Sequence, residues 1–365
     1  MQRRTLLGLA AGGMALGLGG LASWQWLGGQ APLLLSARDD SQGRHYAVGY
    51  RQDGRCQFAT PVAERCHDIA VHPHLPLALF VGRRPSRASY LIDTRDGRLL
   101  QTLHSAAERH FQGHAVFHGA GEWLYSCEND TAQPGRGVIG CYRLTEGRLQ
   151  RVGEHSSHGV GPHQLLWQND GETLVIANGG IRTEADSRQA MNLDAMDASL
   201  VLLQRDGQLL SHERLADQQN SIRHLAVASD GTIVCGQQFM GAAEQAVPLL
   251  AIKRPGQALR AFSLGEAQRQ LMNQYTASLA IHDELRLLAV TAPRGGHCLL
   301  WDLDRETLHL SLPLADCAGI TACTEGFLVS TGQGRCRLLD CRTPTPRVTP
   351  LSLPAGLWDN HWRSA

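Results

Sequence analysis

The chain has 365 residues, with 34 Lys and Arg balanced by 34 Asp and Glu, and 43% of its residues are hydrophobic. The balanced charge gives no basic footprint for nucleic acid and no bias toward an acidic partner. The composition is typical of a soluble globular protein. A chain of this length ordinarily suggests two domains, but an internal repeat favours one closed ring.

The first segment has the features of an export signal. Arg3 and Arg4 precede a run of small and apolar residues from 8 to 22, the pattern of a twin-arginine signal. An uncleaved membrane anchor is the alternative. We expect residues 1–30 to be the export segment and residues 31–365 to be the folded domain, with the periplasm as its compartment.

Seven segments along the chain share a strand–turn–strand pattern, in which an apolar run is followed by a short polar turn and a second apolar run. Their spacing is about 40 to 60 residues, which is the period of four-stranded propeller blades. The segments are 46–54, 90–97, 138–147, 200–207, 249–256, 298–304 and 337–340. This repeat predicts an all-β protein folded as a seven-bladed β-propeller.

A further strand precedes six of these hairpins and is expected to lie innermost in its blade. These strands are 66–71, 113–117, 162–167, 223–227, 277–281 and 320–322. The first hairpin is preceded only by 33–37, which resembles the second strands of other blades. The C-terminal residues 356–362 would supply its missing innermost strand. The ring is then closed by a blade of three N-terminal strands and one C-terminal strand, which leaves no open sheet edge.

Histidine recurs near the start of the predicted innermost strands, which line the axis of a propeller. Five of the seven strands carry one: His67, His114, His163, His224 and His361. A single histidine at a strand start is usually a hydrogen-bonded structural residue, but five at equivalent positions predict a shared site. Imidazole suits iron, copper, zinc and nickel. Since opposite walls of a channel stand apart, two or three neighbours are the expected ligands.

Polar loops between second and third strands should open on the same face as these histidines, where function is often added to a scaffold. The candidate ligand-binding residues there are Asn178, Arg182, Glu128, Asn129, Arg136 and Arg84. Gly-rich polar loops are usually turns. The three arginines could nevertheless together receive an anion, such as a carboxylate or an iron chelate.

Several catalytic and cofactor motifs are absent from the sequence. It contains no Gly-x-Ser-x-Gly elbow, no P-loop and no dinucleotide-binding fingerprint. Cys66 adjoins His67, but Ala63 stands where a haem-attachment motif needs another cysteine, which argues against c-type haem. The ten cysteines permit disulfides in an oxidising compartment or burial as small hydrophobic residues.

Four motifs together resemble the bacterial family called domain of unknown function 1513. They are Gly159-Val-Gly-Pro-His163, Asn178-Gly-Gly-Ile-Arg-Thr183, Ser221-Ile-Arg-His-Leu-Ala226 and Trp358-Asp-Asn-His361. The resemblance covers essentially the whole mature chain. It implies a propeller exported by the twin-arginine route and often encoded beside imelysin-type iron-regulated proteins. The implied role is periplasmic iron acquisition, with no reaction defined.

The leading hypothesis is a periplasmic propeller that binds a transition metal, iron rather than copper, through its channel-mouth histidines. It would serve metal handling or a redox step in iron acquisition. One alternative is a cofactor-free interaction scaffold for a periplasmic partner such as an imelysin-type protein. Another is a metal-dependent hydrolase or lactonase, with a metal-bound water beside Glu128 or Asp130.

Overall fold

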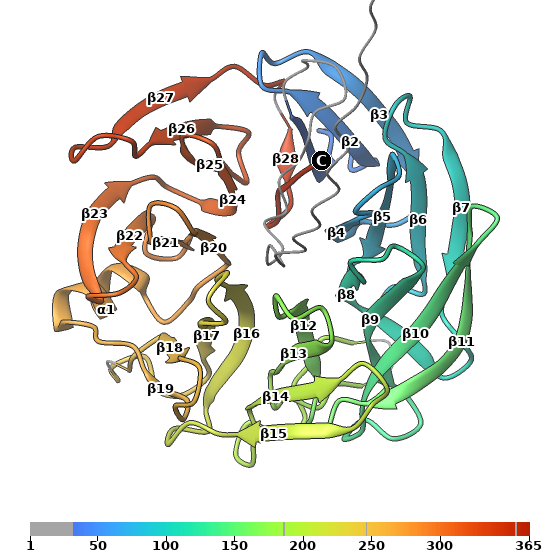
Figure 1. Ribbon diagram of the computed structural model, residues 1–365, viewed down its shortest axis with the longest axis horizontal. Helices are drawn as coiled ribbons and strands as arrows, with labels where there is room; N and C mark the ends of the chain where they lie inside the picture. The colour runs from blue at the N-terminus through green and yellow to red at the C-terminus, as the bar shows by residue number, and fades with distance from the viewer. Residues whose placement is uncertain (1–31, 185–186, 246, 355) are drawn as a thin grey trace, which may run out of the picture.

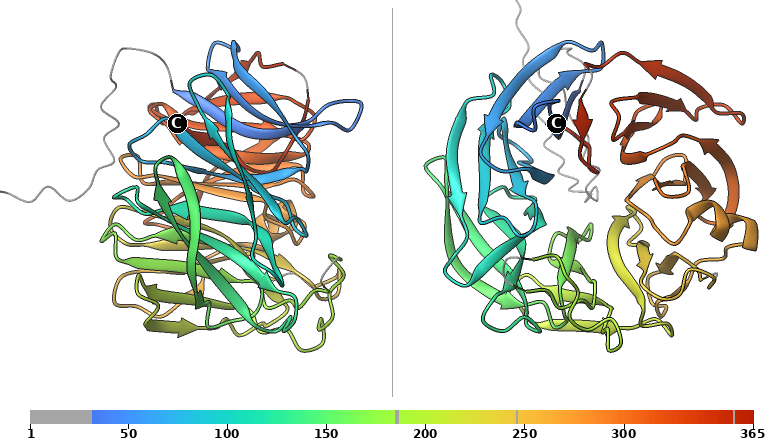
Figure 2. Two further views of the ribbon diagram at one scale, coloured as in Figure 1. Left: turned by 90° about the vertical axis from the view of Figure 1, so that its right-hand side faces the viewer. Right: turned by 180° about the vertical axis from the view of Figure 1, so that it is seen from behind.

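The strands of this protein form seven antiparallel sheets around one central axis (Figure 1). The computed structural model describes residues 32–184, 187–245, 247–354 and 356–365. Figure 2 shows the same ring from behind and from the side. The predicted seven-bladed β-propeller is therefore confirmed. The predicted export segment, residues 1–30, lies outside the described residues.

Six of the sheets are each built from four consecutive strands. One sheet contains β4 (Cys66–Val71), β5 (Leu77–Gly82), β6 (Ala88–Asp93) and β7 (Leu99–His104). The next contains β8 (Arg109–Phe117), β9 (Trp123–Asp130), β10 (Gly137–Thr145) and β11 (Arg148–Ser156). The third contains β12 (Pro162–Trp167), β13 (Thr173–Asn178), β14 (Ser199–Gln204) and β15 (Leu209–Glu213). The fourth contains β16 (Asn220–Val227), β17 (Ile233–Phe239), β18 (Leu250–Lys253) and β19 (Arg260–Ala261). The fifth contains β20 (Ser278–His282), β21 (Leu287–Ala292), β22 (His297–Asp302) and β23 (Thr307–Pro313). The sixth contains β24 (Cys317–Cys323), β25 (Gly326–Thr331), β26 (Cys336–Asp340) and β27 (Arg347–Leu351).

The remaining sheet joins the two ends of the described chain. It contains β1 (Leu33–Asp39), β2 (His45–Arg51) and β3 (Cys56–Val62), and β1 also pairs with β28 (Leu357–Trp358) and β29 (Arg363–Ser364). A single innermost strand was predicted here, whereas the structure has two short strands separated by residues 359–362. His361 lies in that separating segment, where its carbonyl oxygen accepts a hydrogen bond of 2.8 Å from Ser36 Oγ.

The core lies between neighbouring sheets. The second strands β5, β13, β17, β21 and β25 are buried at every residue, as expected for continuous apolar runs covered on both faces. Val175 on β13, for example, belongs to one cluster with Ile222 and Leu225 on the next blade's β16. Burying each such aliphatic side chain stabilises the fold by roughly 1.5–3 kcal/mol. Blade-to-blade packing therefore fixes the innermost strands.

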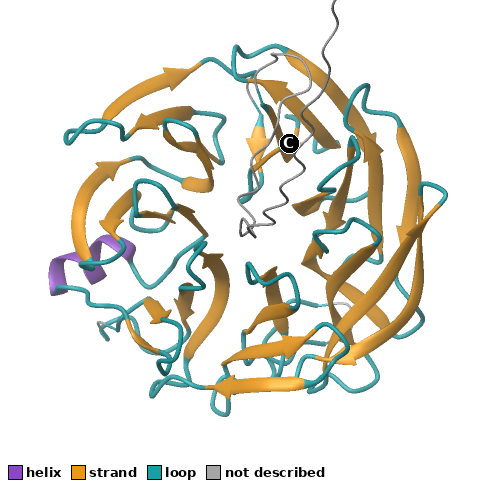
Figure 3. Cartoon of the chain, in the orientation of Figure 1, coloured by secondary structure: helices purple, strands orange, loops and turns teal. Residues whose placement is uncertain are grey.

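The structure contains one helix among its described residues, α1 (Glu266–Met272), on the outer edge of the ring (Figure 3). In the part of the chain that the structure describes, no helix has the length and apolar character needed to cross a membrane. All ten cysteines are free thiols, and eight of them are buried. Their packing in the core matches the small-hydrophobic alternative.

Candidate metal centre

Four of the five predicted histidines lie on innermost strands that contain a β-bulge. The ladder to the second strand skips residues between Cys66 and Ile69 in β4, between Phe111 and Ala115 in β8, between Pro162 and Gln164 in β12, and between Ile222 and His224 in β16. A bulge breaks the alternation of side chains and redirects those beside it. The bulges thus coincide with the positions from which the imidazoles converge.

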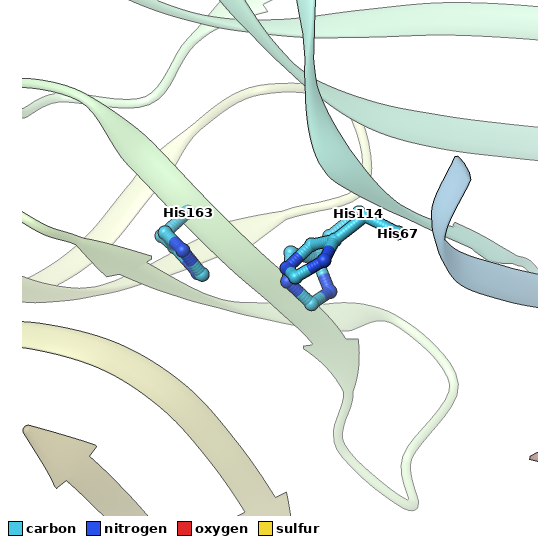
Figure 4. Close-up of side chains that lie close together, drawn as sticks. All are labelled: His67, His114 and His163. Carbon is cyan, nitrogen blue, oxygen red and sulfur yellow. The ribbon is translucent and has the colours of Figure 1, made fainter. Parts of the chain in front are cut away.

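The five imidazole rings form one contact group. The ring centroid of His361 lies 4.7 Å from those of His67 and His114 and 5.1 Å from that of His224. The His163 centroid lies 5.0 Å from that of His114 and 4.9 Å from that of His224. Figure 4 shows His67, His114 and His163 extending toward one another from neighbouring blades. The five rings therefore lie much closer to one another than the expected separation of opposite channel walls implied.

Two overlapping triads have nitrogen atoms close enough to approach one metal ion. They are His67, His114 and His163, and His114, His224 and His361, and the candidate atoms within each triad lie within 4.8 Å of one another. Nitrogen atoms bound to one ion through bonds of about 2.1 Å are separated by roughly 3 to 4 Å. Small inward side-chain movements would therefore complete either triad. Each grouping joins three of the predicted rings, and their binding to a metal stays a prediction.

Two of the rings are oriented by buried carboxylates. His67 Nδ1 lies 2.6 Å from Asp359 Oδ1, and His114 Nδ1 lies 2.7 Å from Asp68 Oδ2. An ionised carboxylate only accepts hydrogen bonds, so each Nδ1 carries the proton and donates it. In the neutral ring, Nε2 then keeps its lone pair for a metal. This carboxylate–histidine arrangement is the usual support of a metal-binding imidazole.

Two further rings have partners of other kinds. His163 Nδ1 donates to the carbonyl oxygen of Arg223 at 3.1 Å. His361 Nδ1 lies 3.3 Å from Ser278 Oγ, and Ser278 occupies the position that histidine holds on other blades. The fifth ring, His224, has a buried Nδ1 without a hydrogen-bond partner among the described residues.

Nitrogen atoms aimed into the cluster lack partners. Nε2 of His114 and Nε2 of His361 are buried and form no hydrogen bond within the described residues. A buried polar atom left without a partner costs about 1–3 kcal/mol, and such atoms are uncommon in folded proteins. His114 Nε2 offers a lone pair, and His361 Nε2 offers one when its Nδ1 donates to Ser278 Oγ. A metal ion accepts such lone pairs, so the donor set fits such a group.

The supporting carboxylates are themselves held by arginines. Asp359 accepts from Arg65 Nε at 2.7 Å and from Arg83 Nη1 at 3.3 Å, whereas Asp68 receives two hydrogen bonds from Arg363, at 2.9 and 2.6 Å. Burial alone would raise the pKa of both carboxyls. The adjoining arginines and imidazoles outweigh it and lower both pKa values. Both groups are therefore ionised at neutral pH.

Burial keeps most of the histidines neutral. It lowers the pKa of His114 to about 4 against the opposing effect of Asp68. Burial and neighbouring histidines, with Arg223 beside His163 and His224, also hold the pKa values of His163, His224 and His361 well below their usual range. Neutral imidazole is the form that binds metal. These four rings are thus ready to bind a metal at neutral pH without first losing protons.

Glu128 and Asn129, two of the predicted loop ligands, lie within β9. The Glu128 carboxylate is buried and accepts from Tyr142 Oη at 2.6 Å and from Arg151 at 3.0 Å. Burial raises its pKa despite these partners. Asn129 is buried beside it and is paired with Gly137 of β10. Both residues thus belong to the packing of their own blade.

Arg136 and Asn178 support loops. Arg136 forms ion pairs with Asp130 at 3.0 Å and Glu154 at 2.8 Å. The buried Asn178 amide donates to the carbonyl oxygen of Ser157 at 3.1 Å. The described contacts of both side chains are therefore with their own or neighbouring blades, and none is with the histidine cluster.

The other two predicted arginines lie in the connections after β5 and β13. Arg182 is exposed, and its guanidinium lies beside Gly135. Arg84 is half-buried, and burial together with the nearby Arg223 and Arg188 lowers its pKa to about 9. Of the three predicted arginines, Arg84 is the one close to Arg188 and Arg223, which form no ion pair with a described carboxylate.

Sequence reasoning missed the two carboxylates that orient the rings. Asp68 follows His67 directly, and Asp359 precedes His361 by two residues. The usable signal was an acidic residue inside a segment predicted to be a buried strand, because such a charge needs a partner. That signal alone does not identify which histidine each carboxylate supports.

Comparison with known proteins places the chain in a family. The model of the family described as "Protein of unknown function (DUF1513)" matches residues 60–365. The chain belongs to this family. The resemblance seen in its four motifs is thereby confirmed. A comparison with curated proteins finds no match for this DUF1513 protein.

Two solved structures show related folds. A chain of Kuenenia stuttgartiensis hydrazine synthase is similar with a TM-score of 0.58 and 12% identity, over 87% of the DUF1513 protein and 95% of that chain. Sqt1 from Saccharomyces cerevisiae is similar with a TM-score of 0.50 and 15% identity, over 78% and 84% of the two chains. At such low identity the likeness shows the fold alone.

Proposed function

We propose that this DUF1513 protein binds one transition metal ion at its five-histidine cluster. The observation that carries the proposal is the combination of outward-anchored Nδ1 atoms with buried, unpartnered Nε2 atoms on His114 and His361. A cofactor-free scaffold would use the histidines to satisfy buried backbone groups. In such a scaffold, the buried Nε2 atoms at the centre of the histidine cluster should also have hydrogen-bond partners.

The shared ligand limits how many ions the cluster holds. His114 belongs to both triads, and its Nδ1 is bound to Asp68. Its Nε2 can therefore bind only one ion at a time. Three imidazoles from either triad would also leave coordination positions open for an external ligand, as in catalytic rather than structural metal sites.

Iron in a periplasmic setting is our proposed form of this centre. Imidazole donors suit iron, copper, zinc and nickel alike. The twin-arginine pattern at Arg3 and Arg4 and the family resemblance favour iron acquisition, with metal handling or a redox step as the role. The hydrolase alternative has less support, because Glu128 is held by Tyr142 and Arg151 and Asp130 by Arg109 and Arg136.

The deciding experiment measures metal content. We expect protein isolated from its own periplasm to contain about one equivalent of iron, measured by elemental analysis with a visible spectrum of the same sample. The double variant His163→Ala/His224→Ala should lose this stoichiometric metal, because each triad then lacks a ligand. It should keep the circular dichroism spectrum of a β-propeller.

A matched double variant controls for the loss of two histidines. His104 and His309 are exposed on the outermost strands β7 and β23, so His104→Ala/His309→Ala should keep its metal. An unchanged metal content in the His163/His224 variant would reject the site. A wild-type protein that is metal-free and takes up no added metal would instead favour the interaction scaffold.

A further inference from the structure

Three arginines from different blades gather beside the histidine cluster. Arg84 lies in the connection from β5 to β6, Arg188 in that from β13 to β14, and Arg223 in β16. Arg188 Nε donates to the carbonyl oxygen of Arg84 at 3.0 Å, although these two blades are separated by another. Second strands end on the face where innermost strands begin, so these arginines share the face of the histidines.

Among the described residues, no ion pair balances the charge of this arginine cluster. Neighbouring arginines are paired, since Arg65 and Arg83 contact Asp359 and Arg363 contacts Asp68. Within the described residues, no carboxylate forms an ion pair with Arg84, Arg188 or Arg223.

Arg223 is the clearest case of this imbalance. Arg223 is only 8% exposed, and its Nε is buried without a hydrogen-bond partner in the described part of the chain. A buried cation without an anion is strongly unfavourable, so such a group normally has a partner. A bound anion would supply that partner.

Glycine at position 179 allows the backbone to lie close against this guanidinium. A Cβ atom at Gly179 would lie 3.3 Å from Arg223 Nε and 3.4 Å from Arg223 Cζ. Glycine therefore avoids crowding the planar face of the group. Arg223 also precedes His224, and its carbonyl oxygen accepts the hydrogen bond of His163. Any ligand of Arg223 would be close to the candidate metal.

We propose that Arg84, Arg188 and Arg223 bind a small oxyanion beside the histidine cluster. The guanidinium fork matches the two oxygens of a carboxylate or phosphate group. This inference goes beyond the metal proposal and does not depend on it, because the argument uses the unbalanced arginines alone. It can therefore be tested on metal-free protein.

The test is calorimetric titration of chelator-treated protein with oxalate and, separately, with inorganic phosphate. We expect one equivalent of at least one probe to bind, with an affinity that weakens as salt is added. Comparison of the two probes distinguishes a carboxylate ligand from a phosphate ligand. Arg223→Gln should weaken binding roughly 10- to 100-fold, because charged hydrogen bonds are lost. The backbone bond to His163 does not involve the replaced atoms.

Two further variants keep the result interpretable. Arg188 is exposed, so Arg188→Gln should fold normally and also weaken binding. Arg305→Gln is the matched control, because Arg305 pairs with Asp302 on a remote outer hairpin, and it should bind as wild type does. Failure of both probes to bind the wild-type protein, or equal binding by Arg223→Gln, would overturn the proposal. Neither outcome would affect the metal measurement.

Discussion

At the scale of single residues, the centre depends on groups that orient the histidines. Asp359 accepts a hydrogen bond from His67 Nδ1 and is held by Arg65 and Arg83. The partner of Nδ1 fixes both the tautomer and the ring plane of the histidine. The negative charge of that partner also makes Nε2 a better donor to a metal. The carboxylates are therefore part of the site even though metal would not touch them.

Replacing Asp359 by Asn should weaken metal binding roughly 10- to 100-fold, the usual effect of losing such a supporting partner. Competition against a chromophoric chelator measures the affinity. Asp340→Asn is the control, because Asp340 pairs with Arg342 in β26 and its turn, and its affinity should equal that of wild type. The free energy of unfolding in urea should be measured for both variants. A purely structural role of Asp359 would reduce this free energy while leaving the metal affinity unchanged.

At the scale of strands and sheets, the bulges separate what could be predicted from what could not. The blades and the histidine positions follow from local patterns, because apolar runs, Gly-containing turns and strand starts recur along the chain. Side-chain direction at the bulges does not, since one extra residue in a strand reverses the expected face. Glu128 shows the same difficulty, because it was assigned to a loop but lies within β9 and faces Tyr142 and Arg151.

The sheet of β8 to β11 also carries a charge network that should respond to pH. Glu154 lies 3.0 Å from Arg109, 2.7 Å from Arg151 and 2.8 Å from Arg136. The hydrogen bond from Arg109 is the main cause that lowers the pKa of Glu154, from 4.5 to about 2. A lowered pKa in the folded state means that stability is fully present above pH 4.5 and is lost as pH falls toward 2.

Glu154→Gln should therefore reduce the free energy of unfolding by about 1–2 kcal/mol at pH 7, after allowance for solvent screening of this partly exposed group. The difference from wild type should shrink toward zero near pH 2. Urea unfolding at a series of pH values measures both quantities. A difference that stays constant between pH 7 and pH 2 would contradict the assigned role of this carboxylate.

At the scale of the whole molecule, the sheet that joins the chain ends also builds the centre. Asp359, His361 and Arg363 alternate along the C-terminal tail and contact His67, Ser278 and Asp68. Trp358 and Trp362 hold this tail by packing with Tyr50 of the first sheet and Leu328 of the last. The same short segment thus completes both the ring and the proposed ligand set.

Trp362→Ala should destabilise the protein by about 3–5 kcal/mol, as expected for a buried aromatic side chain, and should also lower metal occupancy, because the tail is loosened. Trp301→Ala is the matched control, since Trp301 is equally buried but lies in a core cluster remote from the tail. It should lose similar stability in urea unfolding and keep its metal under native conditions. Full metal occupancy in the Trp362 variant would show that metal binding does not depend on the packing of the tail.

The tail has a consequence for the order of events during synthesis. His67 and Asp359 are separated by 292 residues, and Asp68 and Arg363 by 295. While a ribosome is still adding the last blade, the first triad of histidines has already emerged without Asp359 to orient His67. An interrupted chain cannot assemble the anchored cluster. Stable loading with metal would therefore report that a molecule has been translated through this segment and folded.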